Sequence, residues 1–528
     1  MISEATRRWW ALIAIAASVL VVGLDLTVLN LALPTLARDL HASTGDLQWF
    51  SSAYSLVLAA ALLPAGLLGD RFGRKKVLLI ALAVFGVSSA LCAYAGSSGE
   101  LIAARAFLGL GAAAIFPLSL SILPVFFSEE ERPRAIAVVM AATFIGYPVG
   151  PLLGGWLLDN FWWGSVFLIN VPVVVIALIA VATLMPESRA AQRPRLDIVG
   201  VLVSSVGLTG LTYGFIKAGQ GGWSDSAAVT TIAAGAAVLV GFVAWERRVG
   251  QRAAVQPLVE LRLFRSAGFT WGTMLTTLVS FALFGILFAM PQYFQDVRGL
   301  DALGSGLRLL PLIGGMVVGM LVGTRLQAPR KDPAGLPGST PLASAKALVT
   351  LGFGVMAAAL AVGAFTRVSS GTGFGAAWFT AVGAGLGLAM PAAMNAALGA
   401  LSAERSGSGS ALITAMRQVG ATIGVAVLGT VLSSAYRSRL DVAGLPAQAA
   451  AAMRKSLAGG IAVAHEAGSK AQLDDVRIAF AHALDVMLWV CGGIALAATV
   501  LALAFLPRWR GAAGRGTERV RAADEIGV

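Results

Sequence analysis

Residues 66–76 read GLLGDRFGRKK and separate two long apolar stretches, near 47–69 and 76–95. Gly66 and Gly69 allow helix ends to approach closely, and Asp70 can pair with a neighbouring cation or cap a helix N-terminus. A charged turn of this kind, held between two apolar helices, can stabilise one conformation of a membrane protein. We therefore expect a conformational latch formed by Gly66, Asp70, Arg71, Gly73, Arg74 and Lys75.

The composition around this turn is that of a membrane protein. Of the 528 residues, 57% are hydrophobic and 12% are charged, whereas soluble domains carry about 25% charged residues. Runs of about 20 apolar residues, enough to cross roughly 30 Å of hydrocarbon, recur along almost the whole chain. Cys92 and Cys491 lie in such runs, so neither a disulfide framework nor a metal-ligand cluster is expected. No GxxxxGK[ST] loop occurs, which disfavours an ATP-driven pump. We expect neither an enzyme nor a cofactor.

The apolar stretches predict an all-α polytopic fold of about fourteen spans. Six lie before the charged break near residue 190, two more near 197–216 and 227–245, and six between 268 and 506. We therefore expect a six-helix half at 1–190, two inserted helices at 191–250, a second six-helix half at 251–507 and a cytoplasmic tail at 508–528. Within the second half, residues 435–482 form a long hydrophilic outer segment. Its Ala-rich stretches, with Ser469 and Gln472 placed as a capping box, predict a short helical hairpin, and a solvated lid without a specific role is the alternative.

The charge distribution indicates how the chain is oriented. The formal net charge is +12, but the basic residues fall in short segments between spans, so orientation in a membrane is a better interpretation than nucleic-acid binding. Most of these segments lie on one side, which by the positive-inside rule places both termini in the cytoplasm. The expected location is the cytoplasmic membrane, with the lipid bilayer as surroundings and a monomer as the unit.

A weak internal repeat links the two predicted halves. LALPTLARDL in the first span is echoed by FAMPQYFQDV in the ninth, and GLGAAAIFP at 109–117 is echoed by GLGLAMP at 385–391. A Gly-x-Arg turn follows both LALPTLARDL and FAMPQYFQDV, at residues 69–71 and 323–325 respectively. Transporters are often built from such repeats, with the substrate site between them near the bilayer midplane. The order of the echoes favours two related halves.

Four motifs carry a family resemblance that covers the whole chain. Residues 66–76 resemble the loop signature of the major facilitator superfamily at nearly every position. LDLTVLNLALP at 24–34 is similar to the first-span signature of its fourteen-span drug:proton antiporter family, and ARAFLGLGAA at 104–113 resembles the superfamily's proton-transfer signature, centred on Arg105. GYPVGPLLGG at 146–155 resembles the antiporter signature, with Gly146, Pro148, Gly150, Pro151, Gly154 and Gly155 in place.

The resemblance implies the major facilitator fold and a proton-coupled antiporter that exports drugs or antibiotics by alternating access and so confers resistance. WWGSVFLINVP at 162–172 looks most like the quaternary-ammonium and antibiotic exporters. The chain departs from some of these at Ser52, where they carry an acid, and in the span at 408–434, where others carry carboxylates. A proton-coupled importer of a nutrient or siderophore and a non-transporting sensor are the alternatives. The glycine-rich pattern of span five, expected to bring the two halves into close contact, favours export.

Asp25 is the acid that stands farthest from a predicted span end. A carboxylate at the centre of a membrane helix costs at least ~2.5 kcal/mol and usually marks an ion pathway. At 1.5 Å per residue, Asp25 lies about 13 Å below Pro34, and Arg105 lies about 7 Å below the outer end of span four, so the two can share a depth. Making and breaking an Asp25–Arg105 contact would move a proton, while a static ion pair that only joins two helices is the competing interpretation.

The substrate is expected to be an amphiphilic small molecule bound between the halves, with protons as the coupling ion. Polar groups in or beside spans can hydrogen-bond it, and aromatic or flexible side chains can form the walls, although aromatic residues in spans more often pack or lie at the interface. Arg417, deep in its span, would suit a neutral or anionic ligand. The predicted cavity residues are Asn30, Tyr54, Asn170, Phe284, Phe288, Gln292, Met394, Asn395 and Arg417.

Overall fold

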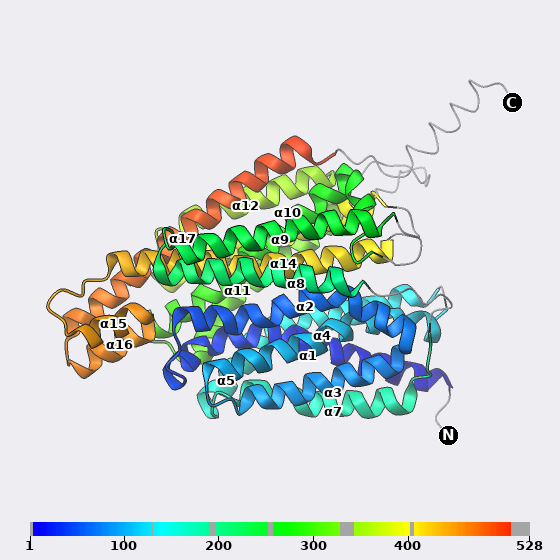
Figure 1. Cartoon of the computed structure of the whole chain (residues 1–528), viewed down its shortest axis with the longest axis horizontal. Helices are drawn as coiled ribbons and strands as arrows, with labels where there is room; N and C mark the ends of the chain where they lie inside the picture. The colour runs from blue at the N-terminus through cyan, green and yellow to red at the C-terminus, as the bar shows by residue number, and fades with distance from the viewer. Residues whose placement is uncertain are drawn as a thin grey trace.

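A computed structural model describes residues 4–128, 130–189, 197–251, 257–327, 343–401 and 406–507. Throughout these residues the chain is helical and contains no strand (Figure 1). The predicted tail at 508–528 lies outside the described residues. The long helices are α1 (Glu4–Asp39), α2 (Thr44–Phe72), α3 (Arg74–Ala93), α4 (Ser98–Phe126), α5 (Arg132–Asn160), α7 (Asn170–Leu184), α8 (Ile198–Gly221), α9 (Ser226–Val249), α10 (Ala267–Gln292), α11 (Ala302–Gln327), α12 (Ala345–Gly363), α13 (Thr372–Leu398), α14 (Ser406–Arg439) and α17 (Lys470–Phe505).

The span prediction is confirmed. Within the described ranges, 13 helices are long and apolar enough to cross a membrane, α7 together with the short α6 (Ser165–Leu168) being one of them. The remaining long helix, α5, has 29 residues and packs along α1. An all-α fold of about fourteen spans follows.

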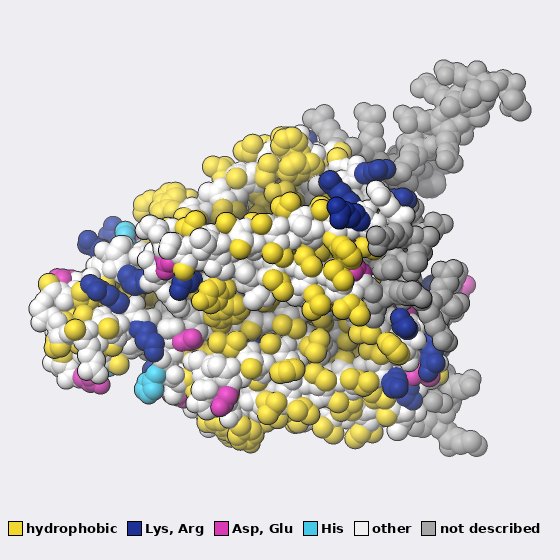
Figure 2. Space-filling model, in the orientation of Figure 1, with side chains coloured by type: hydrophobic (Ala, Val, Ile, Leu, Met, Phe, Trp, Pro, Cys, Tyr) yellow, Lys and Arg dark blue, Asp and Glu magenta, His cyan; other side chains and the backbone are white. Residues whose placement is uncertain are grey.

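The outer surface of the bundle is apolar over its middle. Leu202, Val206, Ile176 and Ile179 are each at least 60% exposed, and hydrophobic side chains cover the centre of the face in Figure 2, while Lys and Arg gather toward the two ends. An apolar belt of this extent is costly in water but is matched by hydrocarbon. We call the end at which α1 begins the inner end, and the opposite end the outer end.

Local sequence signals fix several helix boundaries. Ser43 and Asp46 form a capping box at the start of α2, since the Ser43 hydroxyl accepts from the Asp46 N–H and the Asp46 carboxylate accepts from the Ser43 N–H. Gly73, at φ +115°, separates α2 from α3 in a conformation that favours glycine. Ser469 caps α17 by accepting from the Gln472 N–H, but the Gln472 side-chain oxygen has no partner among the described residues, so the predicted capping box is only half formed.

The helices pack in two groups. Helices α1 to α7 contact one another and form the lower layer in Figure 1, while α10 to α14 and α17 pack together above them. The inserted pair α8 and α9 lies beside both groups, because α8 packs against α2 and α14. On α14, the Thr430 hydroxyl donates to the carbonyl of Phe215 at 2.7 Å, and the Ser433 hydroxyl donates to that of Gly219 at 3.2 Å. The inserted helices therefore lie across the seam between the groups.

The outer segment is shorter than the predicted range 435–482. Helix α14 continues to Arg439 and α17 already begins at Lys470, so residues 470–482 extend the last helix rather than the loop. Between them, α15 (Ala447–Lys455) and α16 (Leu457–Glu466) form a helical hairpin at the outer end. The hairpin is present, but it is shorter than predicted. The sequence analysis assigned the amphipathic start of α17 to the outer segment because the charged residues there interrupt the apolar run.

Candidate functional site

Asp25 and Arg105 form a buried ion pair between α1 and α4. Arg105 Nη1 donates to Asp25 Oδ2 at 2.6 Å, and both side chains are only 2% exposed. Helix α2 completes the arrangement, because Arg105 Nε donates to the carbonyl of Phe50 at 3.1 Å and the guanidinium lies 4.6 Å from the centre of the Tyr54 ring. A proton that binds Asp25 must therefore compete with Arg105 for the same carboxylate.

A small cavity adjoins the pair and lies between the two helix groups. It is lined from the first group by Asn30, Tyr54 and Arg105 and from the second by Phe284 and Val425, together with neighbouring side chains of α1 and α2. Asn30, Tyr54 and Phe284 are among the cavity residues that the sequence predicts, and Arg105 is predicted there as a coupling residue. The Asn30 amide donates to the carbonyl of Leu26, and its oxygen accepts from the Ser51 hydroxyl at 3.2 Å. Sequence reasoning missed the other five, which carry no distinctive chemistry in sequence: Leu26, Leu29, Ser51, Ser55 and Val425.

Asn170 does not line the predicted cavity. Its side chain is 1% exposed and donates to the Ser89 hydroxyl at 3.0 Å, while that hydroxyl donates to the carbonyl of Phe167 at 2.8 Å. These bonds join α7 to α3 within the first group. The prediction was wrong because a polar side chain in a span can be satisfied by a neighbouring helix as well as by a ligand.

The other predicted cavity residues are scattered over the second group. Gln292 is buried near the outer end and donates to the carbonyl of Phe288, one turn back. Asn395 is exposed toward the inner end, where its amide donates to Gln327 Oε1 at 2.9 Å. Arg417 contacts the Ser280 hydroxyl at 3.5 Å. Phe288 is fully buried in the core, and Met394 is half-buried. The structure does not bring these five together with Asn30 and Tyr54.

The glycine pattern of α5 serves mainly to pack α5 against α1. A methyl group added at Gly146 would lie 3.1 Å from the backbone of Gly23, and one at Gly150 would collide with the Thr27 side chain. One at Gly154 would lie 3.1 Å from Val28 Cγ1. These three contacts are within one half, so the expectation that the glycines join the two halves was wrong for them.

Two positions of the same pattern do reach the other half. A methyl group at Gly155 would lie 2.6 Å from Cα of Leu303 on α11, and the carbonyl of Pro151 abuts Gly306 of the same helix. Pro148 and Pro151 both lie inside α5. The Asp159 carboxylate then accepts from the backbone N–H groups of Ala302 and Leu303 at 3.0 and 2.9 Å. The outer ends of α5 and α11 are in direct contact.

Further contacts close the outer end. Gln295 donates to the carbonyl of Leu31 at 2.8 Å, and Arg38 Nη1 lies 3.2 Å from Asp296 Oδ1. The Lys455 ammonium of the outer hairpin donates to the carbonyl of His41 at 2.8 Å. Each bond joins the first group to a segment that follows α9. The outer face is therefore shut in this conformation.

The loop at 66–76 is bonded within the first group at the inner end. Arg74 Nη2 lies 2.8 Å from Asp70 Oδ1, and Arg74 Nη1 donates to the carbonyl of Ser121 at 2.8 Å. Lys75 makes two further contacts: its backbone N–H donates to the Glu187 carboxylate at 3.1 Å, and its ammonium donates to the carbonyl of Ala182 at 2.7 Å. The Arg71 guanidinium lies over the Phe72 ring. The turn is thus tied to α4 and to the end of α7.

The two glycines of this loop behave differently. A methyl group at Gly69 would collide with Leu118 of α4, whereas one at Gly66 would meet no described atom within 4 Å. The expectation of close helix approach holds for Gly69 but not for Gly66 in this conformation, because Gly66 faces a cavity.

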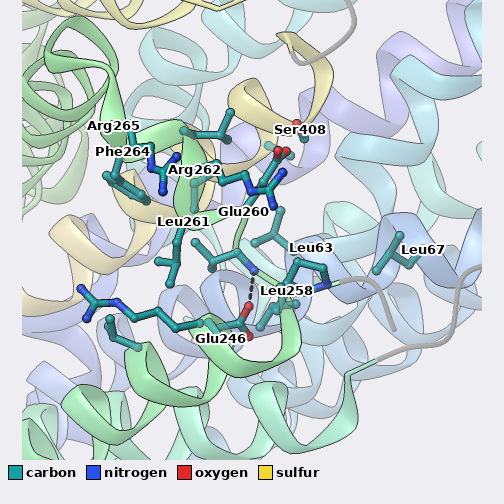
Figure 3. Close-up of a pocket in the computed structure, with 18 of the residues that line it drawn as sticks. Leu63, Leu67, Glu246, Leu258, Glu260, Leu261, Arg262, Phe264, Arg265 and Ser408 are labelled. Carbon is teal, nitrogen blue, oxygen red and sulfur yellow. Dashed lines mark hydrogen bonds between the residues drawn. The ribbon is translucent and has the colours of Figure 1, made fainter. Parts of the chain in front are cut away.

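That cavity, the inner cavity, opens at the inner end and has a volume of about 1290 Å³. It lies between the inner half of α2, the inner end of α14, the end of α9 and residues 257–265, which include the 3-10 turn η1 (Leu261–Arg265). Figure 3 shows Leu63 and Leu67 of α2 on one side, Glu246 of α9 below and Ser408 of α14 above. The conformation is therefore open at the inner end and shut at the outer end.

Sequence reasoning treated Asp25 as nearly alone, but other acids are buried too. Glu246 is 1% exposed, Asp197 is 5% exposed and Asp296 is 7% exposed. All three lie near helix ends, where charged side chains are usually solvated. Among the described residues, no group of three or more His, Cys, Asp or Glu side chains is placed to hold a metal ion.

Comparisons with known proteins agree with the many-span helical fold described above. The profile of the Major Facilitator Superfamily matches residues 15–425. The tetracenomycin C resistance and export protein of Streptomyces glaucescens is 33% identical over 511 residues, covering 94% of this chain and 91% of that protein. The multidrug efflux pump LfrA of Mycolicibacterium smegmatis is 34% identical over 513 residues, covering 95% and 97%. A bacterial homologue of the human lysosomal transporter Spinster, in an inward-facing and occupied conformation, superposes with a TM-score of 0.68 at 16% identity over 96% of this chain and 99% of that one.

Proposed function

The chain belongs to the major facilitator superfamily, and from that premise we propose that it exports amphiphilic drugs or antibiotics across the cytoplasmic membrane in exchange for protons, thereby conferring resistance. The observation that carries the export proposal is the similarity, over nearly the full length, to proteins named for drug resistance and efflux. The chain acts as a transporter and not as an enzyme.

The Asp25–Arg105 pair supports proton coupling. The pair is buried in the half that α1 to α7 form, and Arg105 also lines the small cavity between the halves. A proton arriving at Asp25 would release Arg105, and the freed guanidinium would retain its bonds to Phe50 and its contact with Tyr54. Because Arg105 contacts α2, loss of the pair would alter the surface that faces the substrate.

The two helix groups would act as the halves of an alternating-access transporter. The contacts at Gly155, Asp159 and Gln295 would break as the outer end opens. The inner cavity beside Gly66 would close as α14 approaches α2. The basic loop at 66–76 lies at the inner end, which the positive-inside rule assigns to the cytoplasm, so this conformation would be inward-facing and would accept drug from the cell interior.

The test uses a bacterial strain that lacks its own exporters and expresses this chain. Cells are loaded with a fluorescent amphiphilic drug, and its loss is followed after energisation. Extrusion against the concentration gradient that stops when a protonophore is added supports the proposal. Faster accumulation of the compound in expressing cells than in control cells would contradict export.

A further inference from the structure

A further cavity lies at the outer end of the second helix group. It has a volume of about 270 Å³ and lies between the π-helical turn η2 (Tyr293–Val297), the start of α11 and the start of α13. The connecting segments at this end, residues 298–301 and 364–371, are described throughout. The described residues that line this cavity, the outer cavity, all belong to the second group, so it is separate from the inner cavity and from the small cavity beside Arg105.

The walls of the outer cavity are apolar and largely aromatic. The ring centres of Phe294 and Phe379 lie 5.9 Å apart, and Trp378 stacks on Phe379 at 4.2 Å. Leu307 of α11 also lines the cavity and is 49% exposed on the outer surface of the bundle. Phe374, on the first turn of α13, is 37% exposed. The cavity therefore adjoins the outer margin of the apolar belt, where lipid headgroups meet hydrocarbon.

Two arginines give the outer cavity a positive charge. Arg298 and Arg308 line it, and none of the described lining residues is acidic. Arg298 is bonded to the loop between α12 and α13, since its Nη1 donates to the carbonyl of Val368 at 2.8 Å. Arg308 makes one hydrogen bond to the described residues, from Nη1 to the carbonyl of Gly304 at 3.2 Å. The Nε and Nη2 groups of Arg308 therefore remain able to bind a ligand.

The acids near these arginines have other partners. Asp301 Oδ1 accepts from the Gly304 N–H at 2.8 Å and so caps α11, and Asp485 of α17 interacts with Arg367, which does not line the cavity. Neither of the two lining arginines forms a salt bridge with a described carboxylate. A ligand that enters the outer cavity thus meets positive charge that no described carboxylate pairs with.

Trp378 adds a buried hydrogen-bond donor to the same cavity. It is 2% exposed, and its Nε1 has no acceptor among the described residues. Its ring packs against α12, because a Cβ at Gly363 would lie 2.8 Å from Trp378 Cδ2, and this packing holds the indole in place. A buried indole N–H usually has a hydrogen-bond partner. An anionic oxygen in the cavity would supply that acceptor.

We propose that the outer cavity binds the headgroup of an anionic phospholipid from the outer leaflet. The phosphate oxygens accept from Arg308 and from the Trp378 indole, while Leu307 and Phe379 contact the glycerol and the adjoining part of the acyl chains. Hydrogen bonds between arginine and phosphate are strong because both groups are charged, and basic pockets between membrane helices recognise anionic headgroups in this way. The inference goes beyond the proposed export function and does not depend on the direction of transport.

Charge and surface both favour an anionic lipid as the occupant. A cationic drug would be repelled by Arg298 and Arg308. A soluble anion such as inorganic phosphate would leave the apolar walls uncovered, whereas a phospholipid covers them and can enter from the bilayer past the exposed Leu307. Only the lipid satisfies the arginines, the indole and the walls together.

The test uses the full-length protein in phosphatidylcholine liposomes that contain phosphatidylglycerol with a photoactivatable group near the ester end of one acyl chain. After illumination, mass spectrometry of the peptides should find the label on residues 302–311 or 371–380, which border the cavity. Arg308→Gln and Trp378→Phe should each raise the phosphatidylglycerol content needed for half-maximal labelling roughly tenfold, because each removes a hydrogen bond to a charged group.

Three controls accompany these variants. Trp378→Phe itself keeps the aromatic wall, and size-exclusion chromatography checks that every variant is folded. Arg308→Lys, which keeps the charge, should lose less than Arg308→Gln. Arg439→Gln removes an exposed arginine at the outer end of α14, outside the cavity, and should be labelled like the wild type.

Labelling of Arg308→Gln or Trp378→Phe at the wild-type level, or absence of label from these segments in the wild type, overturns the proposal. Equal labelling by a photoactivatable phosphatidylcholine also overturns it, since that headgroup carries no net charge. Labelling that inorganic phosphate suppresses identifies a site for soluble anions and rules out the lipid. Labelling needs no transport, so a failure of this inference is distinct from a failure of drug export.

Discussion

The guanidinium of Arg105 and the carboxylate of Asp25 meet at 2.6 Å across 80 residues of sequence. Neither side chain has contact with bulk water in this conformation, since each is 2% exposed. Removing one member leaves the other as an uncompensated buried charge, which costs about 3–5 kcal/mol. The pair is therefore both a structural element and the candidate coupling site.

Arg105→Gln should lower the melting temperature of the purified protein strongly, because Asp25 would then be buried without its partner. The double variant Asp25→Asn/Arg105→Gln should recover most of that loss, since no buried charge is left unpaired. Differential scanning fluorimetry on the two variants and the wild type measures this. Equal melting temperatures for the wild type and Arg105→Gln would show that the pair contributes nothing to stability.

Gly155→Val should favour the outward-open state. The Cβ of the added side chain would lie 2.6 Å from Cα of Leu303. Overpacking of this kind costs about 1–3 kcal/mol. Double electron–electron resonance between spin labels at Asn160→Cys and Asp301→Cys should show a longer outer distance. Gly314→Val on α11 is the matched control, because a Cβ there meets no described atom within 4 Å, and it should leave the distance distribution unchanged. An unchanged distribution for Gly155→Val would contradict the role of this contact in outer closure.

A cross-link between Thr44 and Lys455 should stop transport. The Thr44 hydroxyl donates to the carbonyl of Lys455 at 3.3 Å, so the outer hairpin is bonded to the start of α2 and must separate from it when the outer end opens. The Thr44→Cys/Lys455→Cys variant, treated with a short bifunctional thiol reagent, should lose export, while each single variant keeps it. Cys92 and Cys491 are buried and should not react. Full export by the cross-linked protein would show that the hairpin moves with α2.

The charged residues show how much of the candidate site can be predicted from the sequence. Asp25 and Arg105 were identified because a charge inside an apolar run is costly and has few explanations. Glu246 was missed because it stands in WERR at a span end, where charges are usually solvated, and its burial depends on residues 257–265 folding back over it. Pairing between distant helices cannot be read from such a local pattern.

The polar and glycine residues show the same limit. Periodicity located the helices, but it does not say which neighbour a side chain meets. Asn170 and Asn30 have the same chemistry, yet one joins α7 to α3 and the other borders the cavity between the halves. Likewise, one glycine motif packs against α1 at Gly150 and against α11 at Gly155. The arrangement of helices in space decides these contacts.

Asn170→Ala should affect stability and not substrate choice. The change removes a buried hydrogen bond to Ser89, which costs about 1–3 kcal/mol, so the melting temperature should fall. The set of drugs to which expressing cells are resistant should stay the same, in contrast to changes at Asn30 or Phe284 beside the small cavity. A selective loss of resistance to one drug class would place Asn170 in the substrate path after all.

The most direct test of the coupling claim uses purified protein in liposomes. The wild type should accumulate drug when a pH gradient is imposed and should also exchange labelled for unlabelled drug without one. Asp25→Asn, which cannot release a proton, should keep the exchange but lose accumulation driven by the pH gradient. Gradient-driven accumulation by Asp25→Asn at the wild-type level would contradict the account.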